Sequence, residues 1–291
     1  MYRLGVVSFL NSRPLIAGLA ADHRVELLYD VPARLPDWLD EGHVDAALVP
    51  TIDVLRSGGR YHVLSDACIG CEGETMTVRV FSQIPPERIR ALWVDSDSHT
   101  SVALATVLWR RVYGCNLELR RLDARRENLG GVSAVLLIGD KVVGAAGGGF
   151  SYEMDLGAAW RLHTGLPFVF AVWACTNDRG QDSTSDGVRE EPRASARAAT
   201  PLDTHELAKL LSTARDRGVA EAAHIARLHG PDLGWPVELA ERYLTRCLKF
   251  KLDARSIEGA NLFAQLCAEA DIIPGDGRIA WPENSPAAEG Q

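Results

Sequence analysis

The chain of 291 residues has no apolar run long enough to cross a bilayer, which takes about 18 consecutive apolar residues. Its first residues, MYRLGVVSFL, lack the charged region, apolar stretch and cleavage site that a secretory signal combines. If residue 1 is the true start, these absences predict a cytoplasmic protein without a membrane partner.

Positive charge is also scarce. Lysine and arginine number 31 against 39 acidic residues, which gives a formal net charge of −8 and a pI near 5.5. Such a surface repels phosphate backbones, so we do not expect nucleic acid as a partner. A small anion is compatible with this charge, because a local pocket can be positive within an acidic protein. The composition is otherwise ordinary, with 46% apolar residues, and supports one large domain or two modest ones.

The six cysteines do not form a metal-site pattern. Cys68 and Cys71 make the only CxxC motif, and no second pair follows at the spacing that a structural zinc site uses. A redox motif belongs at a helix N-terminus, whereas this one leads into an extended segment. We therefore expect free, mostly buried thiols in a reducing compartment, and neither a metal nor another cofactor.

Familiar catalytic motifs are missing as well. The chain has no nucleophile-elbow or HExxH pattern. Gly147-Gly148-Gly149 lacks the Lys-Ser/Thr of a phosphate-binding loop and is interpreted as a flexible connection. Motifs alone therefore leave the chemistry unassigned.

Strands and helices alternate along the first half of the chain. Apolar runs predict strands at 3–8, 25–29 and 45–50, with helices between them. A second series follows, with predicted strands at 91–95, 117–122 and 134–139 and a helix at 101–113. This order is typical of α/β folds, in which helices cover a largely parallel sheet.

Two long extended runs, 75–82 and 166–175, bracket the second series. We interpret them as two crossing hinge strands that join two lobes, with the ligand site in the cleft between the lobes. The predicted first lobe is 1–83 plus 176–275, and the second is 84–175.

The C-terminal part mixes polar segments and helices. Residues 177–199, rich in Ser, Arg, Asp, Glu and Gly, are predicted to be a mobile surface insertion. Helical spacing of apolar residues follows, including one helix expected at 236–250. Residues 276–291 are expected to form a loose tail.

A polar turn follows the first predicted strand. Ser8 and Asn11 lie between that strand and the next helix, at the sheet edge that faces ligands in open α/β folds. The helix start adds partial positive charge and free N–H groups, which favour an anion. An ordinary capped strand-to-helix turn explains the same residues equally well.

The second lobe repeats the pattern after its strand at 91–95. Hydroxyl residues and His99 fill the stretch from Ser96 to Ser101, at the mouth of a predicted helix. They suit a carboxylate, although capping alone explains one of them. Gly139 permits close approach of a ligand, and Asp140 beside it either faces the site or only caps the turn.

These motifs resemble the chorismate dehydratase family of the futalosine route to menaquinone. The stretch VSFLNSRPL at 7–15 is similar to the VSYLNxxPL signature of that family. Further similar segments follow in the family's order, at 30–35, 45–52, 68–73, 80–82, 100–101, 137–140, 152–157, 160 and 164–174. The resemblance covers residues 2–175 closely and the C-terminal helices loosely.

The resemblance implies a fold and a reaction. The fold is of the two-lobed type II periplasmic-binding-protein class, which agrees with the order of the predicted strands. The reaction removes water from chorismate and gives 3-[(1-carboxyvinyl)oxy]benzoate, without a metal or organic cofactor. The proton leaves ring carbon 3 and the hydroxyl leaves carbon 4, so the ring becomes aromatic. No oligomeric state follows from the sequence.

The resemblance also implies site residues. Asn11 is expected to orient the substrate, and Thr77, where relatives are expected to carry serine, to hydrogen-bond the leaving hydroxyl or a carboxylate. No obvious protein base faces the site, so the substrate's enolpyruvyl carboxylate is the expected proton acceptor. The predicted substrate-binding residues are Ser8, His99, Thr100, Ser101, Gly139 and Asp140.

Three alternatives stay open. A non-catalytic solute-binding protein shares the fold and the cleft, and a signal peptide or lipobox would favour it. The effector domain of a transcription regulator would need a helix-turn-helix before the first strand. A related menaquinone-pathway enzyme acting on a dehypoxanthine futalosine product shares the fold but not this order of motifs.

Overall fold

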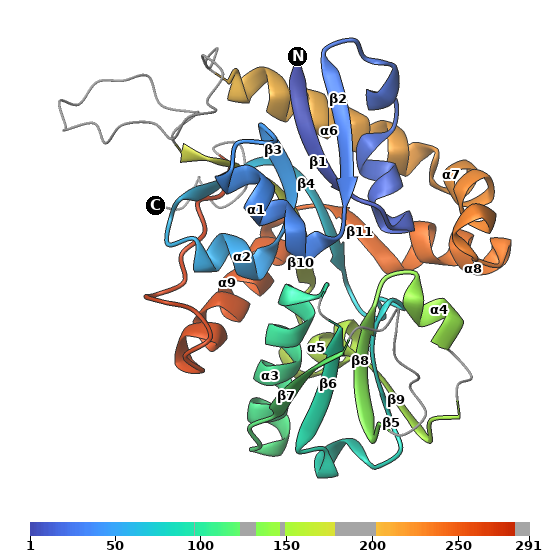
Figure 1. Ribbon diagram of the computed structural model, residues 1–291, viewed down its shortest axis with the longest axis vertical. Coiled ribbons are helices and arrows are strands. Elements are labelled where there is room, and N and C mark those ends of the chain that lie inside the picture. Colours follow the sequence, from blue (N-terminus) through green and yellow to red (C-terminus); the bar gives the residue numbers. More distant parts are fainter. Residues whose placement is uncertain (96, 123–131, 146–148, 178–201, 283–291) are drawn as a thin grey trace.

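The computed structural model describes residues 1–95, 97–122, 132–145, 149–177 and 202–282. They form two lobes, each built on its own sheet, which lie one above the other in Figure 1. The first sheet has six strands in the order β11-β4-β10-β3-β1-β2, and the second has five in the order β7-β6-β8-β5-β9. The predicted two-lobed α/β fold is confirmed.

The first sheet is parallel at one edge and antiparallel at the other. β1 pairs in parallel with β2 and β3, whereas β10 runs antiparallel to β3 and β4. The bounds are β1 (Tyr2–Val7), β2 (Val25–Asp30), β3 (Ala46–Pro50), β4 (Tyr61–Cys71), β10 (Phe168–Thr176) and β11 (Leu248–Lys251). Every residue of β3 is buried, as a central strand covered on both faces requires.

The helices of the first lobe begin with a 3₁₀ turn, η1 (Leu10–Ile16), directly after β1. The others are α1 (Leu35–Asp40), α2 (Thr51–Arg56), α6 (Thr204–Ala220), α7 (Ala222–His229), α8 (Val237–Arg242) and α9 (Ala254–Glu269). The single helix expected at 236–250 is wrong beyond Arg242. The chain forms a π-helical turn there, η7 (Tyr243–Cys247), and then enters β11.

The described residues of the second lobe form the remaining strands and three α-helices, with a 3₁₀ turn at Pro86–Arg88. The strands are β5 (Val78–Ser82), β6 (Ala91–Asp95), β7 (Glu118–Leu122), β8 (Ala134–Ile138) and β9 (Tyr152–Asp155). The helices are α3 (His99–Tyr113), α4 (Lys141–Ala145) and α5 (Leu156–Thr164). Because α3 follows β6 after a short turn, its first residues lie at the edge of the sheet nearest the first lobe (Figure 1).

The predicted lobe boundaries at 83/84 and 175/176 are wrong. β5 pairs with β8 and β9 in the second sheet, whereas β10 pairs with β3 and β4 in the first. Neither extended run spans both sheets; the chain crosses between the lobes in the short connections 72–77 and 165–167. Apolar alternation predicts an extended run but not the sheet that pairs with it.

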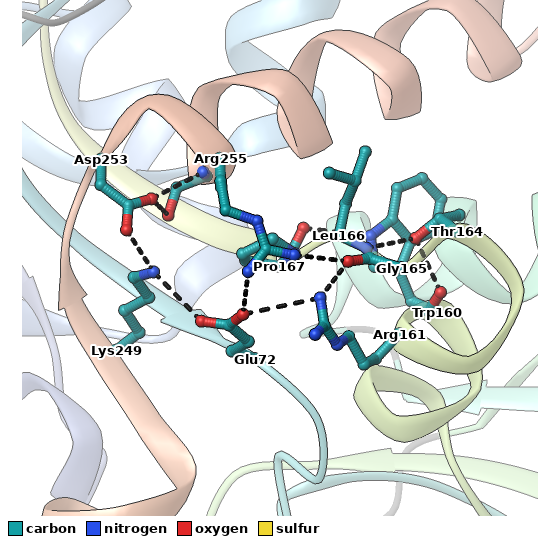
Figure 2. A network of polar contacts seen from close by, with 11 residues as sticks. Glu72, Trp160, Arg161, Thr164, Gly165, Leu166, Pro167, Lys249, Asp253 and Arg255 are labelled. Carbon is teal, nitrogen blue, oxygen red and sulfur yellow. Dashed lines mark hydrogen bonds and ion pairs between the residues drawn. The ribbon is translucent and has the colours of Figure 1, made fainter.

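Ionic contacts gather around Glu72 where the two connections leave the first lobe (Figure 2). Glu72 Oε1 accepts from Arg255 Nη1 of α9 at 2.5 Å and lies 3.5 Å from Arg161 Nη1 of α5. Lys249 Nζ lies 3.4 Å from the other oxygen of Glu72, and Arg255 also donates to Gly165 O at 2.7 Å. One carboxylate therefore links elements of both lobes at the crossing.

The C-terminal segment differs from the expected loose tail. Ile279 is buried, and Val63 N donates to Ala280 O at 3.2 Å. Residues 276–282 therefore pack on the first lobe. Residues 283–291, and 178–199 of the predicted insertion, lie outside the described residues. Within the described ranges, no helix is long and apolar enough to span a membrane.

Candidate active site

A cavity with an empty volume of about 560 Å³ lies between the lobes. Both sheets contribute to it, since β1, β3 and β10 of the first and β5 and β8 of the second supply lining residues. Its apolar wall is formed by Val7, Phe9, Pro32, Pro50, Ile69, Val78, Ile138, Phe170 and Ala171.

Asn11 and Thr77 both line this cavity. Asn11 lies in η1, and its Oδ1 is buried with no hydrogen-bond partner in the part of the chain that the structure describes. Thr77 precedes β5 and is 2% exposed, with Oγ1 2.7 Å from the hydroxyl of Tyr243. The fold thus brings together the two residues that the sequence analysis named for the reaction.

Tyr243 is the site residue that sequence reasoning missed. It lies in the π-helical turn η7, is almost fully buried, and lines the same cavity as Asn11, whose side chain lowers its pKa. Its ring stacks on Trp235, with centroids 4.8 Å apart and planes 15° from parallel. Burial raises the pKa of Tyr243, although the bonds from Thr77 and Asn11 oppose the rise, so the phenol stays protonated at neutral pH.

The start of α3 supplies polar groups from the second lobe. The cavity lining includes Ser98, His99, Thr100 and Ser101, and Ser98 Oγ is buried with no hydrogen-bond partner among the described residues. The hydroxyl of Thr100 donates to Phe170 O at 3.1 Å and accepts from Ile52 N at 3.3 Å. That hydroxyl therefore already joins the lobes. Ser96, the first residue of the predicted stretch, lies outside the described residues.

His99 is held by a carboxylate of the other lobe. Its Nδ1 lies 2.7 Å from Oδ2 of Asp53, which belongs to α2 and also contacts Arg56 at 3.7 Å. When Nδ1–H donates to Asp53, Nε2 is the ring nitrogen left for a ligand. No sequence pattern indicated Asp53, and none indicated Tyr243. An acidic residue in the first turn of a helix, such as Asp53, usually only stabilises that helix.

Gly139 and Asp140 have different roles. Gly139 lines the cavity with φ of +63°, and a Cβ there would come within 2.9 Å of the ring of Phe9. Asp140 is not among the lining residues; it accepts from Trp235 Nε1 at 2.9 Å and from Leu10 N at 3.4 Å. Burial raises the pKa of Asp140, and these two donors oppose that rise. Asp140 therefore ties the second lobe to the first.

Ser8 does not reach the cavity. It is exposed, is not among the lining residues, and donates its backbone N–H to Asp30 O at 3.2 Å. The structure thus brings Asn11, Thr77, His99, Thr100, Ser101 and Gly139 to one cavity but not Ser8 or Asp140.

The ionisable side chains of the lining are Asp97, His99 and Tyr243. Asp97 Oδ2 lies 2.7 Å from Lys141 Nζ, which also contacts Asp95 at 2.7 Å. Each of the three side chains is thus engaged by protein, and none is aligned as an evident free base.

The CxxC cysteines lie away from this chemistry. Cys68 and Cys71 are buried in β4, and three residues apart on a strand they face opposite sides of the sheet. Burial raises the pKa of Cys71 to about 12. Among the described residues, no group of three or more His, Cys, Asp or Glu side chains is arranged to hold a metal ion.

Solved structures with this fold are periplasmic-binding-protein-like. An alkanesulfonate-binding protein from Xanthomonas axonopodis pv. citri, bound to MOPS, superposes with a TM-score of 0.66 at 13% identity, covering 97% of both chains. A Candida albicans protein with the generic periplasmic-binding-protein fold gives a TM-score of 0.60 at 11% identity, covering 94% of this chain and 91% of its own. At these identities the likeness establishes the fold, and it confirms the predicted fold class.

Sequence similarity is more specific. A chorismate dehydratase from Thermus thermophilus is 26% identical over 280 residues, which cover 91% of this chain and 94% of that protein. Residues 2–269 match a protein family described as menaquinone biosynthesis. This match extends through the cavity residues of both lobes and the C-terminal helices, beyond the segments quoted from the sequence. The chain therefore belongs to the menaquinone-biosynthesis family.

Proposed function

We propose that this protein is a chorismate dehydratase, a hydro-lyase that converts chorismate to 3-[(1-carboxyvinyl)oxy]benzoate and water. Its membership of the menaquinone-biosynthesis family and its similarity to the Thermus enzyme support this activity. Part of the proposal is that the enzyme works in the cytoplasm, as the sequence analysis expects.

One geometric observation carries the proposal. Among the described residues, Asn11 Oδ1 and Ser98 Oγ are buried without hydrogen-bond partners, and they belong to residues of opposite lobes that line the same largely apolar cavity. Buried polar atoms in folded proteins are almost always hydrogen-bonded, so such a pair indicates a ligand that bonds to both lobes. Chorismate combines an apolar ring face with two carboxylates and a hydroxyl, which suits this distribution.

The polar groups divide between binding and reaction. The N-terminus of the 15-residue helix α3, with Ser98, Ser101 and His99, is suited to anchor a carboxylate through hydroxyls, an imidazole and free N–H groups. Asn11 and Thr77 then flank the reacting ring carbons. Thr77 Oγ1–H donates to the leaving hydroxyl, and Asn11 orients the ring.

The proton of carbon 3 goes to the substrate's own enolpyruvyl carboxylate in this proposal. Asp97 and His99 are engaged by Lys141 and Asp53, and the phenol of Tyr243 is protonated. The carboxylic acid formed in this way passes the same proton to the departing hydroxyl, so one water is released and the ring becomes aromatic. The apolar wall limits water access and strengthens the hydrogen bonds that align the substrate.

The rival function is non-catalytic binding of a small carboxylate, because solute-binding proteins share this fold. Incubation of the purified protein with chorismate distinguishes the two. We expect loss of chorismate and appearance of an aromatic product lighter by one water, detected by liquid chromatography and mass spectrometry. Tight binding of chorismate without turnover would overturn the proposed dehydratase activity and support the binding protein.

A further inference from the structure

We propose that Tyr243 is a positioning residue that sets which hydrogen-bonding atoms Asn11 and Thr77 present to the substrate. This inference rests on the proposed dehydratase function. It concerns a side chain in the C-terminal half of the chain, far in sequence from both residues that it contacts.

The contacts of the phenol fix one direction for its hydrogen bonds. Among the described residues Asn11 Oδ1 has no partner, and the Asn11 side chain lowers the pKa of Tyr243, as a donor does, so we assign Nδ2 as the Asn11 atom that faces the phenol. The buried phenol has one proton, and Thr77 Oγ1 lies within hydrogen-bond reach at 2.7 Å, so we assign Tyr243 as the donor of that bond.

The same direction determines what faces the ligand. Thr77 keeps its own proton, and the nearest protein acceptor for it, Thr75 O, lies 3.5 Å away, which is long for a hydroxyl donor. That proton is therefore available to a ligand in the cavity. Asn11 presents its carbonyl oxygen and Thr77 presents its O–H, so the site offers one acceptor and one donor. A departing hydroxyl needs a hydrogen-bond donor, and Thr77 O–H provides it. This direction of the hydrogen bonds therefore favours the elimination.

Packing holds the phenol in this position. Tyr243 is 1% exposed and stacked on Trp235, and the π-helical turn that carries it ends at Cys247 where β11 begins. A hydroxyl that served stability alone would not need to contact both proposed reaction residues.

The test compares Tyr243→Phe with Tyr61→Phe in steady-state turnover of chorismate. Tyr61 is the matched control, because it is also buried and its hydroxyl bonds Asp40 Oδ1 at 2.7 Å, but it does not line the cavity. We expect Tyr243→Phe to lower kcat about 10- to 100-fold with KM changed less than about 3-fold. Tyr61→Phe should keep kcat near the wild-type value. Its thermal midpoint should fall by about as much as that of Tyr243→Phe.

A double-mutant cycle separates positioning from general loss of stability. Thr77→Val removes the hydroxyl at nearly constant volume, and Tyr243→Phe should cost little more once Thr77 has been replaced. We expect kcat of the double variant to lie within about 3-fold of the worse single variant. Fully multiplicative losses would show that the two hydroxyls act independently and would overturn the inference.

The outcomes also separate this inference from the proposed function. An active wild type with an unaffected Tyr243→Phe variant overturns the positioning role alone, whereas a wild type that binds chorismate without turnover overturns both. If Tyr243→Phe does not fold, 3-fluorotyrosine placed at 243 or at 61 keeps the hydroxyl but acidifies it. The positioning role then requires kcat to change at 243 and not at 61.

Discussion

Trp235 of the first lobe donates its indole N–H to Asp140 of the second lobe, with Nε1 2.9 Å from Oδ1. The same indole stacks on Tyr243, so one side chain touches both the second lobe and the polar cluster of the cavity. Asp140 also accepts from Leu10 N, next to Asn11. Trp235 therefore connects the contact between the two lobes with the arrangement of the reacting groups.

Trp235→Phe should weaken substrate binding. The ring that stacks on Tyr243 is kept, but the half-buried carboxylate of Asp140 loses its shorter donor, and a hydrogen bond to a charged group is worth about 1.5–3 kcal/mol. We expect KM for chorismate to rise about 10-fold, because the lobes hold together less well.

Trp160→Phe is the matched control for that change. Its Nε1 donates to the neutral carbonyl of Pro167 at 3.0 Å, away from the cavity. It should lower the thermal midpoint while leaving KM within about 2-fold of wild type, since this hydrogen bond contributes about 1 kcal/mol to stability only. Equal KM values for the two variants would contradict the coupling through Trp235.

The sequence predicted the parts of the site that follow strand ends. Asn11 and the residues from Ser98 to Ser101 come directly after β1 and β6, where an α/β sheet exposes side chains to its cleft. Ser8 was named by the same rule, but the structure leaves it exposed and outside the cavity lining.

The remaining contacts depend on packing between distant segments. Tyr243 lies where the helical pattern of 236–250 is interrupted by a π-helical turn, and apolar spacing does not reveal that change of register. Asp53 and Trp235 act through partners in the other lobe, and no local pattern specifies such partners. The sheet boundaries were missed for the same reason, because strand pairing is a tertiary property.

Gly139→Ala should damage both stability and binding. Gly139 has φ of +63°, a left-handed conformation that costs an L-residue about 1 kcal/mol, and an added Cβ would lie 2.9 Å from the ring of Phe9. Phe9 lines the cavity, so its displacement should raise KM about 10-fold, a loss of about 1.4 kcal/mol in binding.

Gly58→Ala is the control, since Gly58 has φ of +62° and no described atom within 4 Å of the added Cβ. Urea unfolding should show a loss for both variants, and an unchanged KM in Gly139→Ala would contradict the steric argument.

Asp253→Asn tests the ionic cluster beside the lobe crossing (Figure 2). Burial would by itself raise the pKa of Asp253, but bonds from Lys249 and Ser256 outweigh it and lower the pKa to about 2. Because this folded-state pKa lies below the ordinary value of 3.8, the stabilisation is complete above about pH 4 and is lost as pH falls toward 2. Asparagine keeps an N-cap oxygen for α9 but not the charge.

The expected deficit of Asp253→Asn is therefore dependent on pH. We expect its free energy of unfolding to be lower than that of wild type by at most about 1 kcal/mol at pH 7, because the side chain is half exposed. Urea titrations should show the same difference in unfolding free energy between wild type and Asp253→Asn at pH 7 and pH 5. At pH 3 that difference should be smaller. If the difference in unfolding free energy between the two proteins grew as the pH fell, the stabilising charge could not be assigned to Asp253.

Asp53→Asn tests whether the contact between lobes at His99 serves substrate binding. Asp53 Oδ2 lies 2.7 Å from His99 Nδ1, and asparagine can keep that geometry while removing the negative charge beside the ring. If His99 anchors a carboxylate, KM for chorismate should rise about 5- to 10-fold with kcat little changed, because the anchor acts equally in the ground and transition states. Asp40→Asn is the matched control, since Asp40 also accepts from a neighbouring side chain, Tyr61, but lies outside the cavity lining. A fall in kcat without a rise in KM would instead assign the Asp53–His99 pair to proton transfer, and the substrate carboxylate would no longer be needed as the base.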